Sequence, residues 1–322
     1  LAWLSKPGRA FLFLRKGYVI MIKLNKEQFI DEIVGKLERI YGQENVQTSI
    51  QIKNNGVKFN AITIHRENRQ LSPCVYIDKY YEKYKMGIME IGDVVRKVVQ
   101  KNEEKMGDDD FDISVLSDYD RACTRIRVRL INTERNGELL LNVPHREFLD
   151  LSLIYYIDMT SDKNKDVSIL CTRVCNSQMA KWKITEQELY QQAMTNMEIC
   201  DEGCIISIWD LFRDRYDADF KEDTEKDETY YIMTNKHLIY GANQLLMKNK
   251  IKDFAAYMEK DIYIIPSSVN ECLLLPICDG TKSPQELCAD VVDVNKTLLP
   301  QDVLSNHVYK YDRNTEEIFI AA

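Results

Sequence analysis

Strand-like runs around one amphipathic helix in residues 230–278 limit the fold of this chain more than any other feature. The β-branched run at 262–265 ends at Pro266, because proline has no amide hydrogen with which to continue a ladder. A capping box is predicted for the next residues, Ser268-Val269-Asn270-Glu271, and it implies one helical turn. The apolar run at 273–275 then predicts another strand. A chain with this pattern folds into a sheet packed against helices.

A small unit of helices around a hairpin is predicted for residues 21–107. Apolar side chains recur at helical spacing in residues 25–41 and predict its first helix. Two segments of alternating apolar and polar residues flank Asn55-Gly56, a dipeptide typical of two-residue hairpin turns. Two more elements are predicted in this unit, a strand at 74–77 and a helix at 89–105.

A larger unit with mixed strands and helices is predicted for residues 108–322. Thr185 and Glu188 fit a second capping box, and the apolar spacing after them predicts a helix. Another helix is predicted to begin at 283–286, where a capping serine, a proline and a glutamate stand together, and to continue along the apolar positions up to Val294. The whole chain is therefore predicted to have an α+β fold of two subdomains, with mixed, largely antiparallel sheets and packed amphipathic helices.

The first twenty residues begin with Leu and precede Met21, after which a clear helix start follows. Their basic residues and short apolar run differ from a signal peptide, because an adequate hydrophobic region and a cleavage site are missing. We interpret residues 1–20 as a leader outside the fold that is non-native or disordered. A weak amphipathic anchor is the alternative.

The overall charge limits the classes of partner. The 322 residues carry a net charge of −8, and residues 214–228 hold eight acids against three bases, which predicts an acidic loop. This balance argues against nucleic acid as a partner, because binding a phosphate backbone needs clustered Lys and Arg. No apolar run reaches the roughly 18 to 20 residues that span a bilayer. The nine cysteines favour reduced thiols and a cytoplasmic location over a disulfide framework.

The sharpest polar feature of the middle of the chain is an alternation of arginine with apolar residues. On a strand, Arg125, Arg127 and Arg129 would place three guanidinium groups on one face. Such groups match carboxylate and phosphate geometry, so we expect an anion site that Arg121 and Arg135 could join. The alternative is a half-solvated strand whose arginines pair with the abundant acids.

Two pairs of cysteines form a candidate zinc site, Cys171 with Cys175 and Cys200 with Cys204. Four thiolates are a sufficient ligand set for tetrahedral zinc. The pairs have three intervening residues, however, whereas the commonest zinc knuckles have two. Buried structural thiols are therefore the alternative.

No catalytic residue and no cofactor is predicted. The four histidines lie in no recognised pattern with serine or cysteine, and the twelve glycines form no phosphate-binding loop. This favours a non-enzymatic binding or adaptor module with a protein partner. A protein or enzyme that binds a small anionic ligand in an arginine-lined pocket is the second hypothesis, so enzymatic activity stays an open question.

Several sequence segments resemble those of a family of uncharacterised Firmicutes proteins, which is common in gut Clostridia and carries a domain-of-unknown-function label. The resemblance covers residues 21–320 and rests on WKITEQELYQQAMTNM, YYIMTN and YIIPSSVNECLLLP, together with RIRVRLINTERNGELLLNVPHREFLDLSLIYYI and DVLSNHVYKYDRNTEEI. The chain is more distantly similar to the YtpQ-type uncharacterised family. Asn270 stands where the family pattern has histidine, which argues against an imidazole in this turn. The resemblance implies an intracellular bacterial protein and no substrate or catalytic residue.

Overall fold

The computed structural model describes residues 12–15, 18–21, 23–67, 72–103, 113–159, 171–200, 203–211, 230–266 and 268–322. Helices and antiparallel sheets build it, so the predicted α+β fold is confirmed. Unit 1 contains Leu1–Lys53 and Lys58–Asp108, and unit 2 contains Asn54–Val57 and Asp109–Ala322. The expected acidic loop at 214–228 lies outside the described residues.

The segment before the first helix contains a two-stranded hairpin. Strand β1 (Leu12–Arg15) pairs antiparallel with β2 (Tyr18–Met21). The interpretation of residues 1–20 as a non-native or disordered leader stays a prediction.

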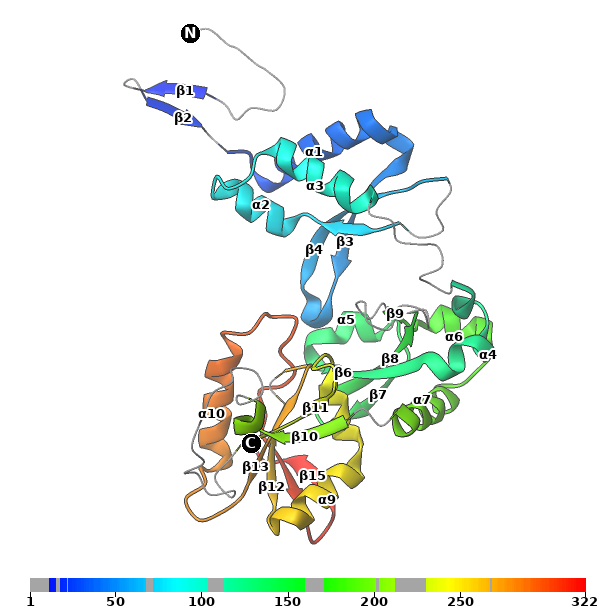
Figure 1. Ribbon diagram of the computed structural model, residues 1–322, viewed down its shortest axis with the longest axis vertical. Helices are drawn as coiled ribbons and strands as arrows, with labels where there is room; N and C mark the ends of the chain where they lie inside the picture. Colours follow the sequence, from blue (N-terminus) through cyan, green and yellow to red (C-terminus); the bar gives the residue numbers. More distant parts are fainter. Residues whose placement is uncertain are drawn as a thin grey trace. The chain divides into compact units, whose positions relative to one another are not determined.

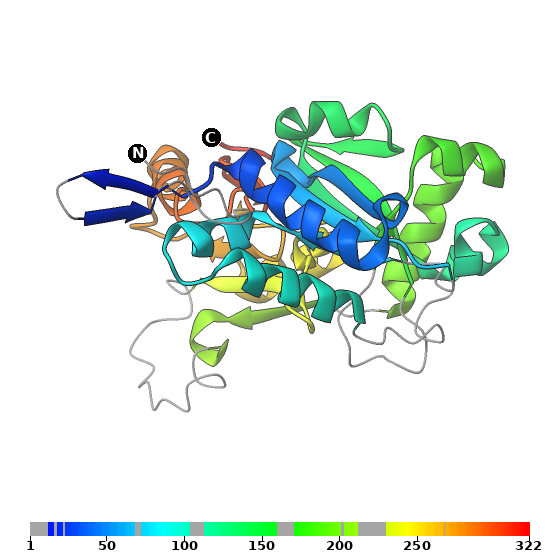
Figure 2. The same cartoon turned by 90° about the horizontal axis from the view of Figure 1, so that it is seen from above.

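Unit 1 combines three helices with a three-stranded sheet in the order β3-β4-β5. Figures 1 and 2 both show α1 and α3 side by side. Its elements are α1 (Lys26–Tyr41), η1 (Gln43–Asn45), β3 (Val46–Ile52), β4 (Lys58–Ile64), β5 (Cys74–Tyr76), α2 (Asp78–Lys85) and α3 (Ile91–Glu103), with η2 (Asn54–Gly56) at the turn between β3 and β4.

Local signals explain most of this unit. Asn25 and Gln28 form the capping box that starts α1, and Gly42, with a φ of 89°, ends it. The hairpin turn has positive φ at both Asn55 and Gly56, at 59° and 67°, as its dipeptide predicts. The core residues of α1 and α3 pack with Ile62 and Ile64 of β4. Helix α2 was not predicted, because its tyrosine-rich sequence lacks a capping side chain.

Unit 2 contains two antiparallel sheets. In one, β8 pairs with β6, β7 and β9, and the other has the order β10-β11-β13-β12-β14-β15. Its strands are β6 (Ile126–Asn132), β7 (His145–Phe148), β8 (Leu151–Asp158), β9 (Cys171–Arg173), β10 (Gly203–Ser207), β11 (Tyr231–Asn235), β12 (Ile262–Ile265), β13 (Cys272–Pro276), β14 (Tyr309–Asp312) and β15 (Glu317–Ile320). Its helices with defined bounds are η4 (Ile113–Leu116), α4 (Tyr119–Ala122), η5 (Cys123–Arg125), η6 (Glu134–Asn136), α5 (Gly137–Leu140), α6 (Asn176–Trp182), α7 (Glu186–Cys200), η8 (Gly241–Leu246), α9 (Lys248–Met258) and α10 (Pro284–Asn295).

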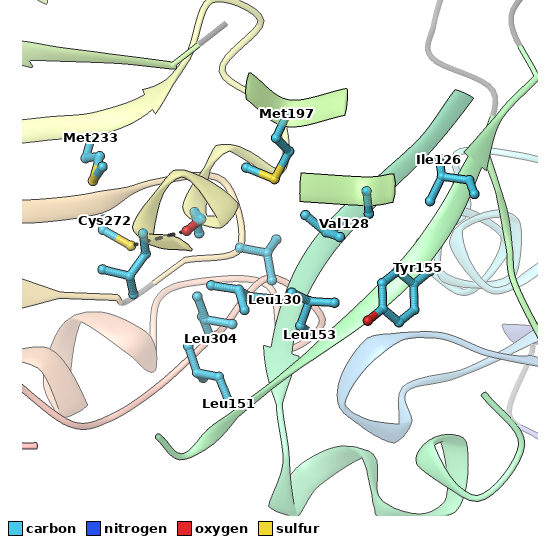
Figure 3. Close-up of a cluster of buried hydrophobic side chains, with 14 of the residues drawn as sticks. Ile126, Val128, Leu130, Leu151, Leu153, Tyr155, Met197, Met233, Cys272 and Leu304 are labelled. Carbon is cyan, nitrogen blue, oxygen red and sulfur yellow. Dashed lines mark hydrogen bonds between the residues drawn. The ribbon is translucent and has the colours of Figure 1, made fainter. Parts of the chain in front are cut away.

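One hydrophobic cluster joins the two sheets of unit 2. Figure 3 shows Val128 and Leu130 of β6 together with Leu151 and Leu153 of β8, and strands of the six-stranded sheet contribute residues such as Cys272. The opposite face of the six-stranded sheet packs against α10. Each sheet of this unit therefore buries one face in a shared core.

The capped helices of unit 2 confirm two predictions, and the turn after β12 corrects a third. Thr185 and Glu188 exchange capping hydrogen bonds at the start of α7, and Ser283 caps α10. Ser268, in contrast, accepts a hydrogen bond from the amide of Asn270 at 3.0 Å, and no helical turn forms. The proposed capping box was wrong because the hydroxyl bonds two residues ahead, as in an ST-turn.

Candidate functional site

Three arginine side chains share the face of the four-stranded sheet that points away from the shared core. Alternation along β6 buries Val128 and places Arg127 and Arg129 on the other face. Arg127 lies opposite Tyr156 of β8, and Tyr156 lies opposite Arg173 of β9. One row across three strands therefore carries two guanidinium groups beside a phenol ring. We call Arg127, Arg129, Arg173 and Tyr156 the arginine face.

Arg129 is held between two aromatic rings. Its guanidinium carbon lies 3.8 Å from the ring centroid of Tyr156 and 3.4 Å from that of Tyr240. Stacking of this kind attracts the cation to the ring faces and fixes the plane of the guanidinium group. Arg129 also forms a hydrogen bond with the thiol of Cys171. The side chain is thus positioned by contacts that include no ion pair with a carboxylate of the described residues.

The loop after β11 holds Tyr240 in an unusual conformation. Tyr240 has a φ of 54°, in the left-handed region that bulky residues rarely adopt. Its amide donates to Oδ1 of Asn270 at 3.1 Å, and Asn235 Nδ2 donates to the carbonyl of Ile239 at 2.8 Å. These bonds keep the ring over Arg129 in spite of the backbone strain.

The arginine face has an excess of positive charge. Arg127 donates to the carbonyl oxygens of Thr124 and Ile126, at 3.0 and 3.1 Å. Nε of Arg173 is buried and has no hydrogen-bond partner among the residues with described positions. None of the three guanidinium groups makes an ion pair with a carboxylate among the residues that the structure describes.

A cysteine borders the same face. Cys171 of β9 lies opposite Asp158, on the same side of the sheet as Tyr156. Burial raises the pKa of the Cys171 thiol, and the Arg129 guanidinium acts in the opposite direction without reversing the shift. The thiol is therefore protonated at neutral pH, and its sulfur accepts from the guanidinium group of Arg129 as a neutral group.

Only part of the predicted arginine set comes together. Arg127 and Arg129 share the face, and Arg125 precedes them in η5. Arg121 lies in α4, where it contacts Asp118 and Ser114, and Arg135 lies in η6 beyond the other end of β6. Arg173 was missed, because only the strand register brings it next to Tyr156.

The four cysteines of the candidate zinc site are not brought together. Cys171 lies beside Arg129, Cys175 Sγ lies 3.1 Å from the hydroxyl of Ser177, and Cys204 belongs to a strand of the six-stranded sheet. Within the described ranges, no three His, Cys, Asp or Glu side chains form a group that could hold a metal ion.

A second polar cluster ties α7 to the four-stranded sheet. Glu186 accepts hydrogen bonds from Nε and Nη2 of Arg146, at 3.2 and 2.7 Å, and from the hydroxyl of Tyr155. Burial works to raise the pKa of Glu186, but the hydrogen bonds from Arg146 and Tyr155 lower it below its usual value. The guanidinium group also stacks on Tyr190. Because the opposite charges are paired here, the cluster stabilises packing.

Three of the four histidines bind amide or backbone oxygens. His65, His145 and His307 each form a hydrogen bond through a ring nitrogen to an amide or backbone oxygen, at 3.0 Å. None of these three bonds involves a serine, a cysteine or a carboxylate. The arginine face is therefore the best candidate for a functional site among the residues described.

Comparison with protein families bears on the identity of the chain. The sequence model of DUF5688, described as a family of unknown function, matches residues 26–313. The chain belongs to this family. The resemblance to a domain-of-unknown-function family is thereby confirmed. No curated protein and no solved structure matches this DUF5688 chain significantly, so the role of its arginine face has to be inferred from geometry.

A transmembrane segment was not expected from the sequence. A helix that crosses a bilayer needs a long apolar run, and the described helices of the DUF5688 chain include none that qualifies.

Proposed function

We propose that this protein binds a small ligand through an anionic group, carboxylate or phosphate, at the arginine face. The observation that carries the proposal is the row of Arg127, Tyr156 and Arg173 beside Arg129, without an ion-pairing carboxylate among the residues described. Protein interiors and surfaces normally pair clustered guanidinium groups with acids or anions. A bound anion would supply the missing charge.

Two positively charged side chains, Arg127 and Arg173, flank Tyr156 on the neighbouring strands. Arg127 and Arg173 both lie opposite Tyr156, and repulsion between them destabilises the folded chain unless a counter-charge intervenes. Among the described residues, no group accepts from Nε of Arg173, which is buried. An anion beside the guanidinium group of Arg173 would offset the repulsion between the two arginines.

Arg129 is arranged to recognise the shape of an anion. Its stacking between Tyr156 and Tyr240 orders the guanidinium plane before a ligand arrives, so less side-chain entropy is lost on binding. The edge of that plane carries the N–H donors that bind carboxylate or phosphate in a fork. The two rings therefore position the charge, and the edge provides specificity.

Calorimetric titration with pyrophosphate and with citrate, in low-chloride buffer, tests this function and distinguishes the two anion classes. We expect saturable binding of at least one probe, and a loss of about tenfold or more in affinity in Arg129→Gln and in Arg173→Gln. Arg121→Gln and Arg135→Gln serve as matched controls that lose the same charge elsewhere and should bind as the wild type does. Absence of binding by both probes, or an equal loss in the controls, would contradict the proposal.

The other hypotheses from the sequence stay predictions. These are a non-enzymatic adaptor role with a protein partner, a cytoplasmic bacterial setting with an origin in Firmicutes, and the distant YtpQ-type likeness. The alternative that the arginines belong to a half-solvated strand and pair with acids predicts no saturable anion binding, so the same titration separates it from the proposal.

A further inference from the structure

Unit 1 contains an open groove between the first half of α1 and strand β3. Its volume is about 540 Å³, and its lining includes the half-buried Ile30 above the buried side chains of Ile62 and Ile77. Ile50 of β3 borders the groove with 64% of its surface exposed. Ile50 is thus an apolar side chain that the described part of unit 1 leaves uncovered, and Ile30 beside it is half-buried.

Strand β3 has a free edge beside this groove. Among the described strands it pairs only with β4. The amide of His65 donates to the carbonyl of Asn45 at 2.8 Å, in continuation of the β3–β4 register. Because hydrogen-bonded and non-hydrogen-bonded pairs alternate in an antiparallel ladder, the N–H and C=O groups of Thr48 and Ile50 point away from β4. These groups are free to pair with another strand.

The sequence of β3 does nothing to block such pairing. Natural sheets protect their edges with charged residues, proline or bulges. The seven residues of β3, V-Q-T-S-I-Q-I, include no charge and no proline, and their register with β4 is continuous. An unprotected edge of this length is a template for strand addition.

The rim of the groove is acidic. Glu27 and Asp31 lie one helical turn apart on α1, and both are exposed and line the groove. Neither has an ion-pair partner among the residues described, whereas Lys26 on the same rim is paired with Asp78. The uncompensated charge on this side is therefore negative.

We propose that this groove binds an extended peptide segment of a partner protein, which adds to β3 as a further strand. Main-chain hydrogen bonds to Thr48 and Ile50 provide affinity, and alternate side chains enter the groove. An apolar side chain of the peptide covers Ile50, and a lysine or arginine two residues away faces Glu27 and Asp31. The inference concerns unit 1 and is independent of anion binding in unit 2.

A second copy of the chain fits this surface less well. In a β3-to-β3 pairing, the side chains entering the groove would come from Val46, Thr48, Ile50 and Ile52, which share one face of the strand. None of them is basic, so Glu27 and Asp31 would stay uncompensated. Charge complementarity thus favours a peptide with a cationic side chain.

Selection of random seven-residue peptides displayed on phage, with the full chain as bait, tests the proposal. We expect enrichment of an apolar residue followed two positions later by lysine or arginine. A synthetic peptide with the enriched motif should then bind in fluorescence anisotropy, and should lose about tenfold in affinity against a Glu27→Gln, Asp31→Lys double variant.

A matched pair at one position isolates the strand edge. Ile50→Pro removes the outward N–H group, and Ile50→Ala removes the same side chain but keeps that group. We expect binding to be several-fold weaker in Ile50→Pro than in Ile50→Ala, with similar unfolding temperatures. Failure to enrich a motif, a motif whose binding survives both the charge change and the proline, or self-association through β3 without peptide binding would each overturn the proposal.

Discussion

The guanidinium carbon of Arg129 lies 3.4 Å from the ring centroid of Tyr240. Arg129 belongs to β6 of the four-stranded sheet, and Tyr240 lies in the loop that follows β11 of the six-stranded sheet. Tyr240 keeps a φ of 54°, a conformation that costs a bulky residue of order 1 kcal/mol or more. The hydrogen bond from its amide to Asn270 offsets part of that cost. The contact with Arg129 makes the strained loop part of the surroundings of the arginine face.

Replacement of Tyr240 by alanine should lower the free energy of unfolding by about 1 kcal/mol, because the cation–π contact is lost while the strained backbone remains. It should also weaken pyrophosphate or citrate binding, because Arg129 then keeps only one ring. Urea unfolding and calorimetry measure the two effects. Tyr240→Phe keeps the ring and should match the wild type; a Phe variant as impaired as the Ala variant would show that the hydroxyl, not the ring, matters.

Elements with local signals could be predicted from the sequence. The capping boxes at Asn25, Thr185 and Ser283 depend on residues three positions apart, and each starts a helix. Strands β7 and β10 were missed, because they are short and are stabilised by pairing with distant strands. The capping box predicted at Ser268 was wrong, because a contact with a distant residue overrides the local signal there. The amide of Val269 donates to the carbonyl of Asp302 at 2.8 Å.

The candidate site could be predicted only in part. Alternation in one strand was enough to place Arg127 and Arg129 on one face. The same reasoning cannot extend to Arg121 and Arg135, which lie in helical turns where a period of two no longer holds. Arg173 joins the face through its register with Tyr156, and no single sequence reveals which strands pair.

Gly241 should not tolerate a side chain. A Cβ at this position would lie 2.2 Å from Oγ1 of Thr234, 2.6 Å from the amide nitrogen of Asn235 and 2.7 Å from the carbonyl oxygen of Asn270. Two of these atoms belong to the backbone and cannot rotate away, so we expect Gly241→Ala to destabilise the chain by about 2 kcal/mol or more in urea unfolding. Gly137→Ala, at a position with no heavy atom within 4 Å of the added Cβ, should be neutral or slightly stabilising.

The Tyr309 hydroxyl should stabilise the contact between the two sheets of unit 2. It donates to Oδ1 of Asp150, whose Oδ2 accepts from the hydroxyl of Ser305 at 2.7 Å. Tyr309→Phe would leave this carboxylate short of a donor, and we expect a loss of about 1–3 kcal/mol in thermal or urea unfolding. Tyr263→Phe in the neighbouring strand β12 is the control, because that hydroxyl has no hydrogen-bond partner among the described residues. Equal losses in both variants would argue against a specific role of Asp150.

Glu271 should make the stability of the chain fall as the pH rises above its ordinary titration range. Burial raises the pKa of the Glu271 carboxyl above its ordinary value of 4.5, and the nearby Asp302 adds to the shift, while a hydrogen bond from Ser268 opposes it. Between 4.5 and the raised pKa, the folded chain binds more protons than the unfolded chain. The free energy of unfolding contributed by this group therefore decreases with rising pH in that window.

Glu271→Gln removes the titrating group and keeps an oxygen that can accept from Ser268. The variant should be more stable than the wild type at pH 7, and the difference should shrink as the pH falls and disappear below about 4.5, where the wild-type carboxyl is protonated in both states. Urea unfolding from pH 4 to pH 7 measures this difference, with the exposed Glu198→Gln as the control for the loss of one negative charge. A constant difference across this range would mean that Glu271 acts through packing, because a packing effect has no reason to depend on the protonation of the carboxyl.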